Sequence, residues 1–223
     1  DLGRRQEAVQ LEEKVLEARK RTLGDEHPDT LLSMGNLAAS YSDLGRRQEA
    51  VQLEEKVLEA RKRTLGDEHP DTLLSMGNLA ASYSDLGRRQ EAVQLEEKVL
   101  EATQRTLGDE HPHTLLSMGN LAASYSDLGR RQEAVQLEEK VLKARKRTLG
   151  DEHPHTLLSM GNLEFYLTNL ADPQNHDLFS SPQQPEHQIK PTQIARIRSA
   201  WTRWGLGLDV KSQFIRHWST SEN

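Results

Sequence analysis

Apolar residues recur at steps of three and four along most of the chain, the spacing that places them on one face of an α-helix. Two such stripes alternate, one between Pro70 and Leu86 and one between Arg89 and Leu107. The first consists of Leu73, Met76, Leu79, Ala80, Tyr83 and Leu86. The second consists of Ala92, Leu95, Val99, Ala102 and Thr106, flanked by Val93 and Leu100. The pattern predicts pairs of amphipathic helices.

Proline and glycine mark the boundaries of these helices. Pro70 suits the first helical position, where its missing N–H would have no partner in any case. Gly87 and Gly108 follow the last apolar residue of each stripe and are expected to end the helices. The connection at Gly87-Arg88 is so short that the two helices of a pair must be antiparallel neighbours.

The helix pair is repeated with a period of 42 residues, because the string that opens at Asp1 returns at Asp43, Asp85 and Asp127. Residues 1–42 and 43–84 are identical. The third copy differs from the second only at Thr103, Gln104 and His113, and the fourth departs from the pattern at Glu164, where the other copies have Ala. A single pair cannot bury both of its apolar stripes, whereas stacked copies can. The chain is therefore expected to form an all-α solenoid.

The repeat pattern predicts a helical array over residues 1–170, and the change of composition after it predicts a linker over 171–191 and an amphipathic tail over 192–223. The tail either folds back as a cap on the last helix or is disordered, and the sequence leaves both open. The first expected helix lacks an upstream partner, so its stripe is covered by preceding repeats of a longer protein, pairs with another copy, or is simply exposed in a fragment. The expected helices are residues 5–23, 28–44, 47–65, 70–86, 89–107, 112–128, 131–149 and 154–170.

Composition narrows the function classes. The chain is 35% hydrophobic and 29% charged, with a net charge of −6, so it lacks the basic surface that binds nucleic acid. No stretch approaches the roughly 20 apolar residues of a membrane-spanning helix. The chain has no cysteine, no signal peptide at its start and no initial Met. We expect a cytoplasmic protein, and the opening in mid-motif indicates a piece of a longer one.

Leu79, Ala80, Tyr83, Ala92 and Val99 resemble, in this spacing, the signature of the tetratricopeptide repeat. The 42-residue period and the link Leu65–Pro70 resemble the kinesin-light-chain subtype, and the strings are also similar to repeat regions of fungal nucleotide-binding receptor-like proteins. Two places usually aromatic in the family hold Arg89 and Glu96 instead. The resemblance implies a right-handed α-solenoid in which the first helix of each pair lines a concave groove.

The resemblance also implies a peptide-binding groove lined by Leu74, Gly77, Asn78, Ala81 and Ser84 together with their copies. An amide both donates and accepts, so an Asn can pair with the backbone of an extended peptide. The alternative is that each Asn bonds only its neighbouring helix. Aspartates bordering the groove favour basic or neutral peptides. The candidate groove residues are Asn36, Asn78, Asn120, Asn162, Asp43, Asp85, Asp127, Leu74 and Leu116.

The sequence shows no arrangement of residues that is typical of a catalytic or metal-binding site. His111 and His113 flank a proline that should splay them apart, and a metal site needs three or four converging ligands. The carboxylate pair Glu12 and Glu13, with its copies, is expected on a solvated helix face. No nucleophile is coupled to a base. We therefore expect no enzyme, no cofactor and no metal.

The function that this predicts is a protein-interaction scaffold, adaptor-like, for extended peptides or partner helices. The alternative is the ligand-sensing repeat arm of a nucleotide-binding NTPase receptor whose catalytic domain lies upstream. A hydrolytic enzyme that uses the tail is the least favoured reading.

Overall fold

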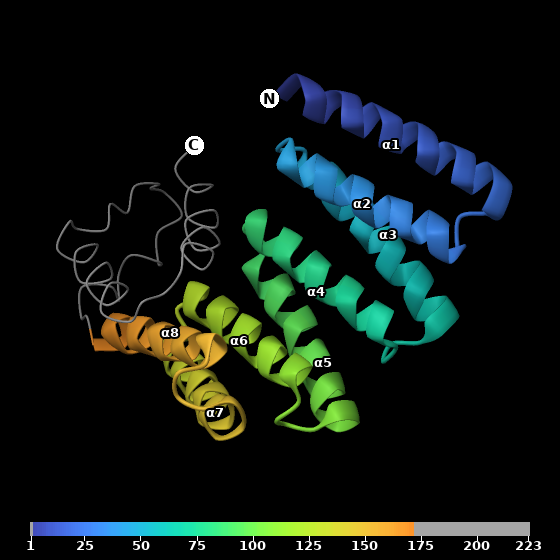
Figure 1. The fold of residues 1–223 in the computed structure, drawn as a ribbon. Helices are drawn as coiled ribbons and strands as arrows, with labels where there is room; N and C mark the ends of the chain where they lie inside the picture. Colours follow the sequence, from blue (N-terminus) through green and yellow to red (C-terminus); the bar gives the residue numbers. More distant parts are fainter. Residues whose placement is uncertain (1, 172–223) are drawn as a thin grey trace. The chain divides into compact units, whose positions relative to one another are not determined.

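The computed structural model describes residues 2–171, which form eight α-helices in chain order (Figure 1). The helices are α1 (Leu2–Leu23), α2 (Pro28–Asp43), α3 (Arg47–Leu65), α4 (Pro70–Asp85), α5 (Arg89–Leu107), α6 (Pro112–Asp127), α7 (Arg131–Leu149) and α8 (Pro154–Ala171). Each packs chiefly on the helix before it and the helix after it. The predicted all-α solenoid is confirmed. The predicted linker and tail lie outside the described residues from position 172 onward.

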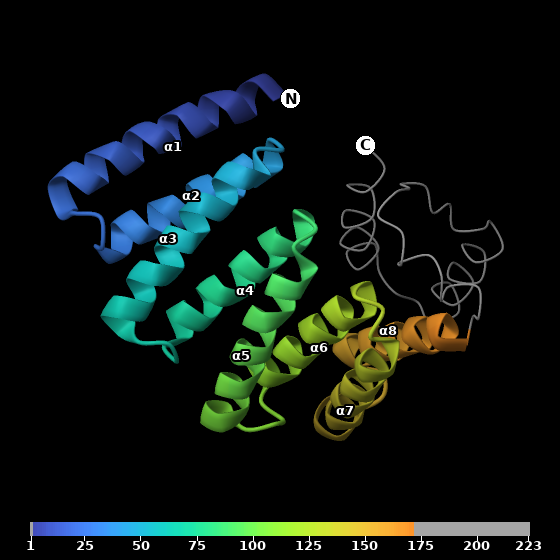
Figure 2. The ribbon, with the colours of Figure 1, turned by 180° about the vertical axis from the view of Figure 1, so that it is seen from behind.

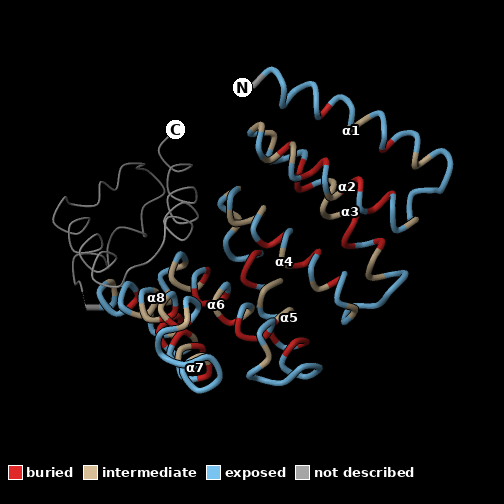
Figure 3. The backbone as a smooth tube through the Cα atoms, viewed as in Figure 1, coloured by how far each residue is buried: buried red, intermediate tan, exposed pale blue. Residues whose placement is uncertain are grey.

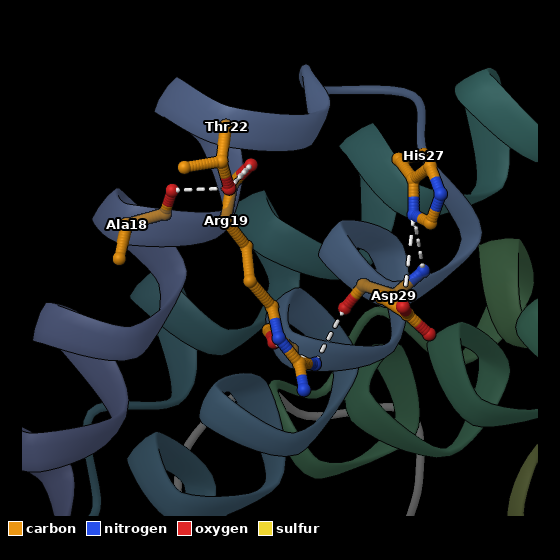
Figure 4. A network of polar contacts seen from close by, with 6 residues as sticks. Ala18, Arg19, Thr22, His27 and Asp29 are labelled. Carbon is orange, nitrogen blue, oxygen red and sulfur yellow. Dashed lines mark hydrogen bonds and ion pairs between the residues drawn. The ribbon is translucent and has the colours of Figure 1, made fainter.

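The even-numbered helices begin at the His-Pro step. His69 caps α4, since its Nδ1 accepts a hydrogen bond from the main-chain N–H of Asp71 at 3.1 Å. The same bond forms at His27 in α2, where Figure 4 shows it reaching Asp29. Pro70 then occupies the first turn, as its missing N–H allows. A histidine in this link is therefore a helix cap.

A glycine with positive φ turns each even-numbered helix into the next odd-numbered one. After α4, Gly87 adopts a φ of +77°. The main-chain N–H of Arg88 donates to the oxygen of Tyr83 at 2.8 Å, and that of Gly87 donates to the oxygen of Ser84 at 2.8 Å. This pair of bonds is the Schellman motif, which satisfies the last carbonyls of a helix. A glycine here allows a turn that other residues enter only at a cost.

The odd-numbered helices α3, α5 and α7 are buried on two sides, and α3 shows the pattern. Ala50 and Val57 pack against α2 in one apolar cluster. Val51 and Leu58 pack against α4 in the next. The buried positions follow the inner surfaces of the stack in Figure 3, and the view from behind in Figure 2 shows the same order of helices. The core is therefore a series of small clusters, each shared by consecutive helices.

An arginine ties each odd-numbered helix to the next even-numbered one in three of the four copies. Arg19 of α1 donates from Nη1 to the main-chain oxygen of Asp29 at 2.8 Å and to Oγ of Ser33 at 2.7 Å (Figure 4). Arg61 and Arg145 make the equivalent bonds. The third copy has Thr103 at this position, whose hydroxyl bonds the main chain of its own helix instead.

Helix α8 departs from its counterparts in its second half. Ala171 occupies the position of Gly129, which turns the chain with a φ of +77° after α6. Alanine disfavours that conformation, and the chain is still helical at Ala171. Tyr166 replaces Ser124 and packs with Ala122, Ala134 and Val135. The fourth copy therefore fills its core with a large ring where the others place a small hydroxyl.

Candidate functional site

We call the exposed side of α2, α4, α6 and α8 the even-helix face, and it repeats one pattern on α2, α4 and α6. On α4, Leu74, Asn78, Ala81 and Asp85 follow at steps of four, three and four, so they lie on one side of the helix. All four are exposed, and Leu74 retains 58% of its accessible surface. The face therefore carries four rows that run from helix to helix: leucine, asparagine, alanine and aspartate.

The structure places the predicted groove residues on this face. Leu74 and Leu116 form part of the leucine row, and Leu116 is 53% exposed. The asparagine and aspartate rows are exposed on the first three even-numbered helices, at positions Asn36, Asn78, Asn120, Asp43, Asp85 and Asp127. Asn162 differs, because it is half-buried and lies close enough to Glu138 to oppose the rise in the pKa of that carboxyl that burial causes. Asn162 thus contacts the neighbouring helix, whereas the other three amides face solvent.

A carboxylate lies behind the aspartate row in the second and third copies. Glu54 of α3 is partly buried beside Ser82 and Asp85 of α4. Burial raises the pKa of Glu54, the negative charge of Asp85 raises it further, and the Ser82 hydroxyl opposes both. Glu96 has the same surroundings from Ser124 and Asp127, and its pKa is raised for the same reasons. A raised pKa favours the neutral form of each carboxyl, so burial and the neighbouring aspartates limit the negative charge that Glu54 and Glu96 add behind the face.

Glu138 of α7 occupies the position equivalent to Glu54 and Glu96 and is the most deeply buried of the three. Its side chain is 0% exposed, and neither carboxylate oxygen has a hydrogen-bond partner of good geometry within the described residues. Burial raises the pKa of Glu138, although Ser159, Arg145 and Asn162 lie near enough to oppose the shift. The prediction that the glutamate pairs lie on a solvated face is wrong for the first glutamate of each pair, because Glu12, Glu54 and Glu96 each bury one carboxylate oxygen as well. In the second position, Glu97 and Glu139 are exposed.

In the first three copies, the second glutamate of the pair belongs to a clamp that the sequence pattern did not reveal. The Tyr83 hydroxyl of α4 donates to Oε1 of Glu55 in α3 at 2.8 Å. The Arg88 guanidinium lies 3.9 Å from the centre of the Tyr83 ring and donates to both carboxylate oxygens of Glu91 in α5. The clamp thus joins three consecutive helices, with equivalents at Tyr41 and Tyr125.

The electrostatics of this clamp are consistent with its contacts. Burial and the Glu55 carboxylate raise the pKa of Tyr83 to about 12, and Tyr125 has the same value for the same reasons with Glu97. The hydrogen bonds from Arg88 lower the pKa of the Glu91 carboxyl. Leu167 replaces the tyrosine in α8, so the described part of that helix carries no such clamp.

The fourth copy changes the end of the even-helix face. Phe165 occupies the alanine row and is 46% exposed, and its ring meets that of Tyr166 edge-on with centroids 5.8 Å apart. Asn169 replaces the aspartate. On α8, the alanine row therefore ends in an apolar ring and the aspartate row ends in a neutral amide.

The paired histidines do not form a metal centre. The prediction that His111 and His113 splay apart is wrong, since their rings stack with centroids 5.4 Å apart, and His153 and His155 do the same at 5.3 Å. His111 Nδ1 is already occupied as a helix cap. Across residues 2–171, no three residues among His, Cys, Asp and Glu gather closely enough to hold a metal ion.

The length and polarity of the helices show whether any of them could cross a membrane. Of the helices between Leu2 and Ala171, none combines the length and apolar character that a membrane crossing requires.

Comparison with known proteins agrees with this geometry. A crystal structure from Podosopora anserina, described as kinesin light chain nearly identical TPR-like repeats, is 36% identical, covers 90% of this chain and 89% of its own, and has a TM-score of 0.71. A variant of that protein aligns with a TM-score of 0.72 at 36% identity, covering 90% of this chain and 88% of its own. BtubC (BKLC) from P. vanneervenii shares the fold at 22% identity and a TM-score of 0.66, covering 90% and 75%. No curated protein sequence matches the chain.

The repeat itself identifies the family. The family described as tetratricopeptide repeat matches residues 1–29, 30–71, 72–113 and 114–155. These matches cover well over half of the chain, and the helix pairs and kinesin-light-chain-like neighbours have the same architecture. The chain therefore belongs to the tetratricopeptide repeat family, whose stacked helix pairs are protein-interaction scaffolds.

Proposed function

We propose that the chain binds an extended peptide, or a helix of a partner protein, along the even-helix face. The observation that carries the proposal is the register of the four rows. Leucine, asparagine, alanine and aspartate are exposed at equivalent places on α2, α4 and α6. Leu32, Leu74 and Leu116 are 51%, 58% and 53% exposed at the same place on three consecutive even-numbered helices, and apolar residues gathered on one face, unlike single scattered ones, mark interaction sites.

Each row has a separate role in this proposal. The leucine row offers apolar contact to one edge of a peptide. The asparagine row pairs with the peptide main chain, because each amide supplies a donor and an acceptor whatever side chains the peptide carries. The alanine row leaves room for the peptide backbone between them. The aspartate row attracts Lys or Arg at the other edge, and Glu54 and Glu96 lie behind it.

The ligand class follows from these rows. We expect an extended segment that is apolar along one edge and basic or neutral along the other. The face has no Lys or Arg among its rows, so an acidic peptide or a terminal carboxylate finds no counter-charge there. In an adaptor, as the neighbours named after kinesin light chain suggest, such a segment would belong to a cargo or partner protein.

A second candidate is the sensing arm of a nucleotide-switched receptor. The near-identity of the copies favours it, since recently multiplied repeats suit a recognition surface that varies. The coding region ahead of Asp1 would distinguish the adaptor from the receptor. A phosphate-binding loop there supports the receptor, and a long heptad segment supports the adaptor.

The experiment measures binding of labelled peptides by fluorescence anisotropy, with a set of extended peptides that differ only in charge. Asn36, Asn78 and Asn120 are changed together to alanine. The matched control changes Gln52, Gln94 and Gln136, which are exposed on the odd-numbered helices, to alanine. We expect the asparagine variant to weaken binding at least tenfold, since each lost hydrogen bond contributes about 0.5–1.5 kcal/mol. The glutamine variant should bind as the parent does.

Charge is tested separately by changing Asp43, Asp85 and Asp127 to lysine. The preference should then reverse from basic to acidic peptides, and the effect should shrink as salt is raised. If the asparagine and glutamine variants behave alike, or the lysine variant keeps its preference, the even-helix face is not the binding surface.

A further inference from the structure

The third copy lacks an arginine that the other copies use to join consecutive helices. In the second copy, Nη1 of Arg61 donates to the main-chain oxygen of Asp71 at 2.9 Å and to Oγ of Ser75 at 2.8 Å. Figure 4 shows the same arrangement between the arginine of α1 and the start of α2. Thr103 stands at the equivalent position of α5, and its hydroxyl bonds the main chain of its own helix. The acceptors on α6 therefore receive no guanidinium from α5.

These two acceptors keep their arrangement in the third copy. They are the main-chain oxygen of His113 and Oγ of Ser117, which we call the acceptor pair. Ser117 Oγ donates to the His113 oxygen at 3.0 Å. Ser75 makes the same bond at the same length in the second copy, where Arg61 is bound to both groups. The acceptor pair thus has the geometry that binds a guanidinium in the neighbouring copy.

The acceptor pair is also more open than its counterparts. Ser33, Ser75 and Ser159 are each bonded to an arginine and are 7%, 4% and 0% exposed, whereas Ser117 is half-buried. Helices α5 and α6 still share an apolar cluster across their contact, as α3 and α4 do. The two helices have therefore not moved together to replace the arginine. Since Thr103 is 5% exposed, a ligand reaches the acceptor pair from the Ser117 side.

The polar side chains next to Thr103 on α5 have other partners. Gln104 Nε2 donates to Oδ1 of Asp109 at 2.9 Å, and Arg105 forms an ion pair with Glu68. Among residues 2–171, no arginine or lysine donates to the acceptor pair in place of the missing arginine. The site is thus left to a group from outside the described chain.

We infer that the acceptor pair of α6 binds an arginine side chain of a partner protein, at the place that an internal arginine fills in the other copies. A guanidinium suits it, because its N–H groups lie in a rigid fork, whereas an ammonium is a compact and more strongly hydrated charge. The place is sheltered from water, since burial lowers the pKa of Arg145 at the equivalent position of α7.

Two hydrogen bonds are few for a free small cation, but an arginine carried by a docked partner is present at a high effective concentration. The acceptor pair lies beside the rows of the even-helix face, because Ser117 is not part of any row. The site is therefore independent of the peptide proposed for that face, and either proposal can fail without the other.

The site is tested by urea unfolding of the full chain, followed by circular dichroism, with N-acetyl-arginine amide as the probe. A ligand that binds only the folded chain raises the ratio of folded to unfolded protein about tenfold at ten times its Kd. We expect this rise for the parent protein. Thr103→Arg fills the site from within, so it should show no such rise, and N-acetyl-lysine amide should have little effect on either protein.

The second copy allows the site to be created. Arg61→Thr should open an equivalent site there, so the same probe should raise the ratio about a hundredfold, as two independent sites require. Ser117→Ala removes one acceptor and should abolish the response of the parent. Ser126→Ala is the matched control, because Ser126 is also half-buried on α6 but outside the acceptor pair.

Equal responses of the parent and Thr103→Arg overturn the inference, as does a parent that does not respond. An equal effect of the lysine probe would contradict the preference for a guanidinium. Free arginine distinguishes the source of the group. If it stabilises the parent more than the capped residue does, the site serves the amino acid and not the side chain of a partner protein, which also contradicts the inference.

Discussion

Replacing Glu138 by glutamine should stabilise the protein at neutral pH. Glu138 is fully buried, and its two carboxylate oxygens lack hydrogen-bond partners of good geometry in the described part of the chain. Burial raises the pKa of this carboxyl above its ordinary value of 4.5. Glutamine has nearly the same shape but no charge, so it removes the cost of holding or neutralising a carboxylate at this site.

The pH dependence has a definite sign. Below about pH 4.5 the carboxyl is protonated in both the folded and the unfolded chain, and Glu138 contributes no dependence there. As pH rises, the unfolded chain loses its proton first, because the folded pKa is the higher one. The free energy of unfolding therefore falls from about pH 4.5 up to the folded pKa and is level beyond it. The glutamine variant lacks this fall.

The magnitude follows from the missing partners. A buried polar group without a hydrogen bond costs about 1–3 kcal/mol and a charged one costs more, so glutamine removes only the excess that ionisation or forced protonation adds at higher pH. We expect a gain of about 1 kcal/mol at pH 7.5, or a rise in Tm of about 2–4 °C for a chain of this size. At pH 4 the two proteins should unfold at the same temperature.

The assay is thermal and guanidinium unfolding followed by circular dichroism at pH 4 and pH 7.5. Glu139→Gln is the control, because Glu139 is adjacent but exposed, and it should change stability little at either pH. The reasoning is refuted if Glu138→Gln destabilises the protein at pH 7.5, which would mean that Arg145, Ser159 and Asn162 hold an ionised carboxylate favourably. It is also refuted if the gain is the same at both pH values.

Three further pairs of changes test the repeated contacts and turns, each by guanidinium unfolding. Thr103→Arg should add about 1 kcal/mol, because it restores the arginine that bonds the next helix in the other copies, and Arg61→Thr should remove a similar amount. Tyr83→Phe should cost about 0.5–1 kcal/mol through the lost bond to Glu55, whereas Tyr166→Phe, with no hydroxyl bond seen among the described residues, should cost less. Gly77→Ala, inside α4 with open space around the new methyl group, should stabilise by about 0.5–1 kcal/mol, but Gly87→Ala should destabilise by about 1–2 kcal/mol because its φ is +77°.

The sequence was sufficient for the helices and for the even-helix face, since both depend on local rules. The His-Pro step and the Leu-Gly step mark where helices begin and end, and periodicity alone places Leu74, Asn78 and Asp85 on one exposed side. Whether a peptide binds there remains a prediction. The resemblance to tetratricopeptide repeats is confirmed by the family match.

The buried glutamates could not be predicted in this way. An amphipathic pattern assigns one apolar stripe to the core and treats every Glu as solvated. The odd-numbered helices are covered on two sides, so their buried surface is wider than the apolar stripe, and Glu54, Glu96 and Glu138 fall inside it. The clamp of Tyr83 and Glu55 joins residues 28 positions apart. Its available signal was the tyrosine hydroxyl in an otherwise apolar stripe, which needs a partner when buried.

The near-identity of the copies also bears on how a peptide would bind. A peptide on the even-helix face, as proposed, would meet the same leucine, asparagine and aspartate on α2, α4 and α6. Shifting it by one repeat exchanges equivalent contacts, so those three helices cannot fix its position along the array. Among the even-numbered helices that the structure describes, only α8 differs, with Phe165 exposed in the alanine row and Asn169 in place of the aspartate. A peptide therefore binds at a single position along the array only if one of its large apolar residues contacts Phe165. Phe165→Ala should let the peptide bind at several equivalent positions while changing its total affinity little.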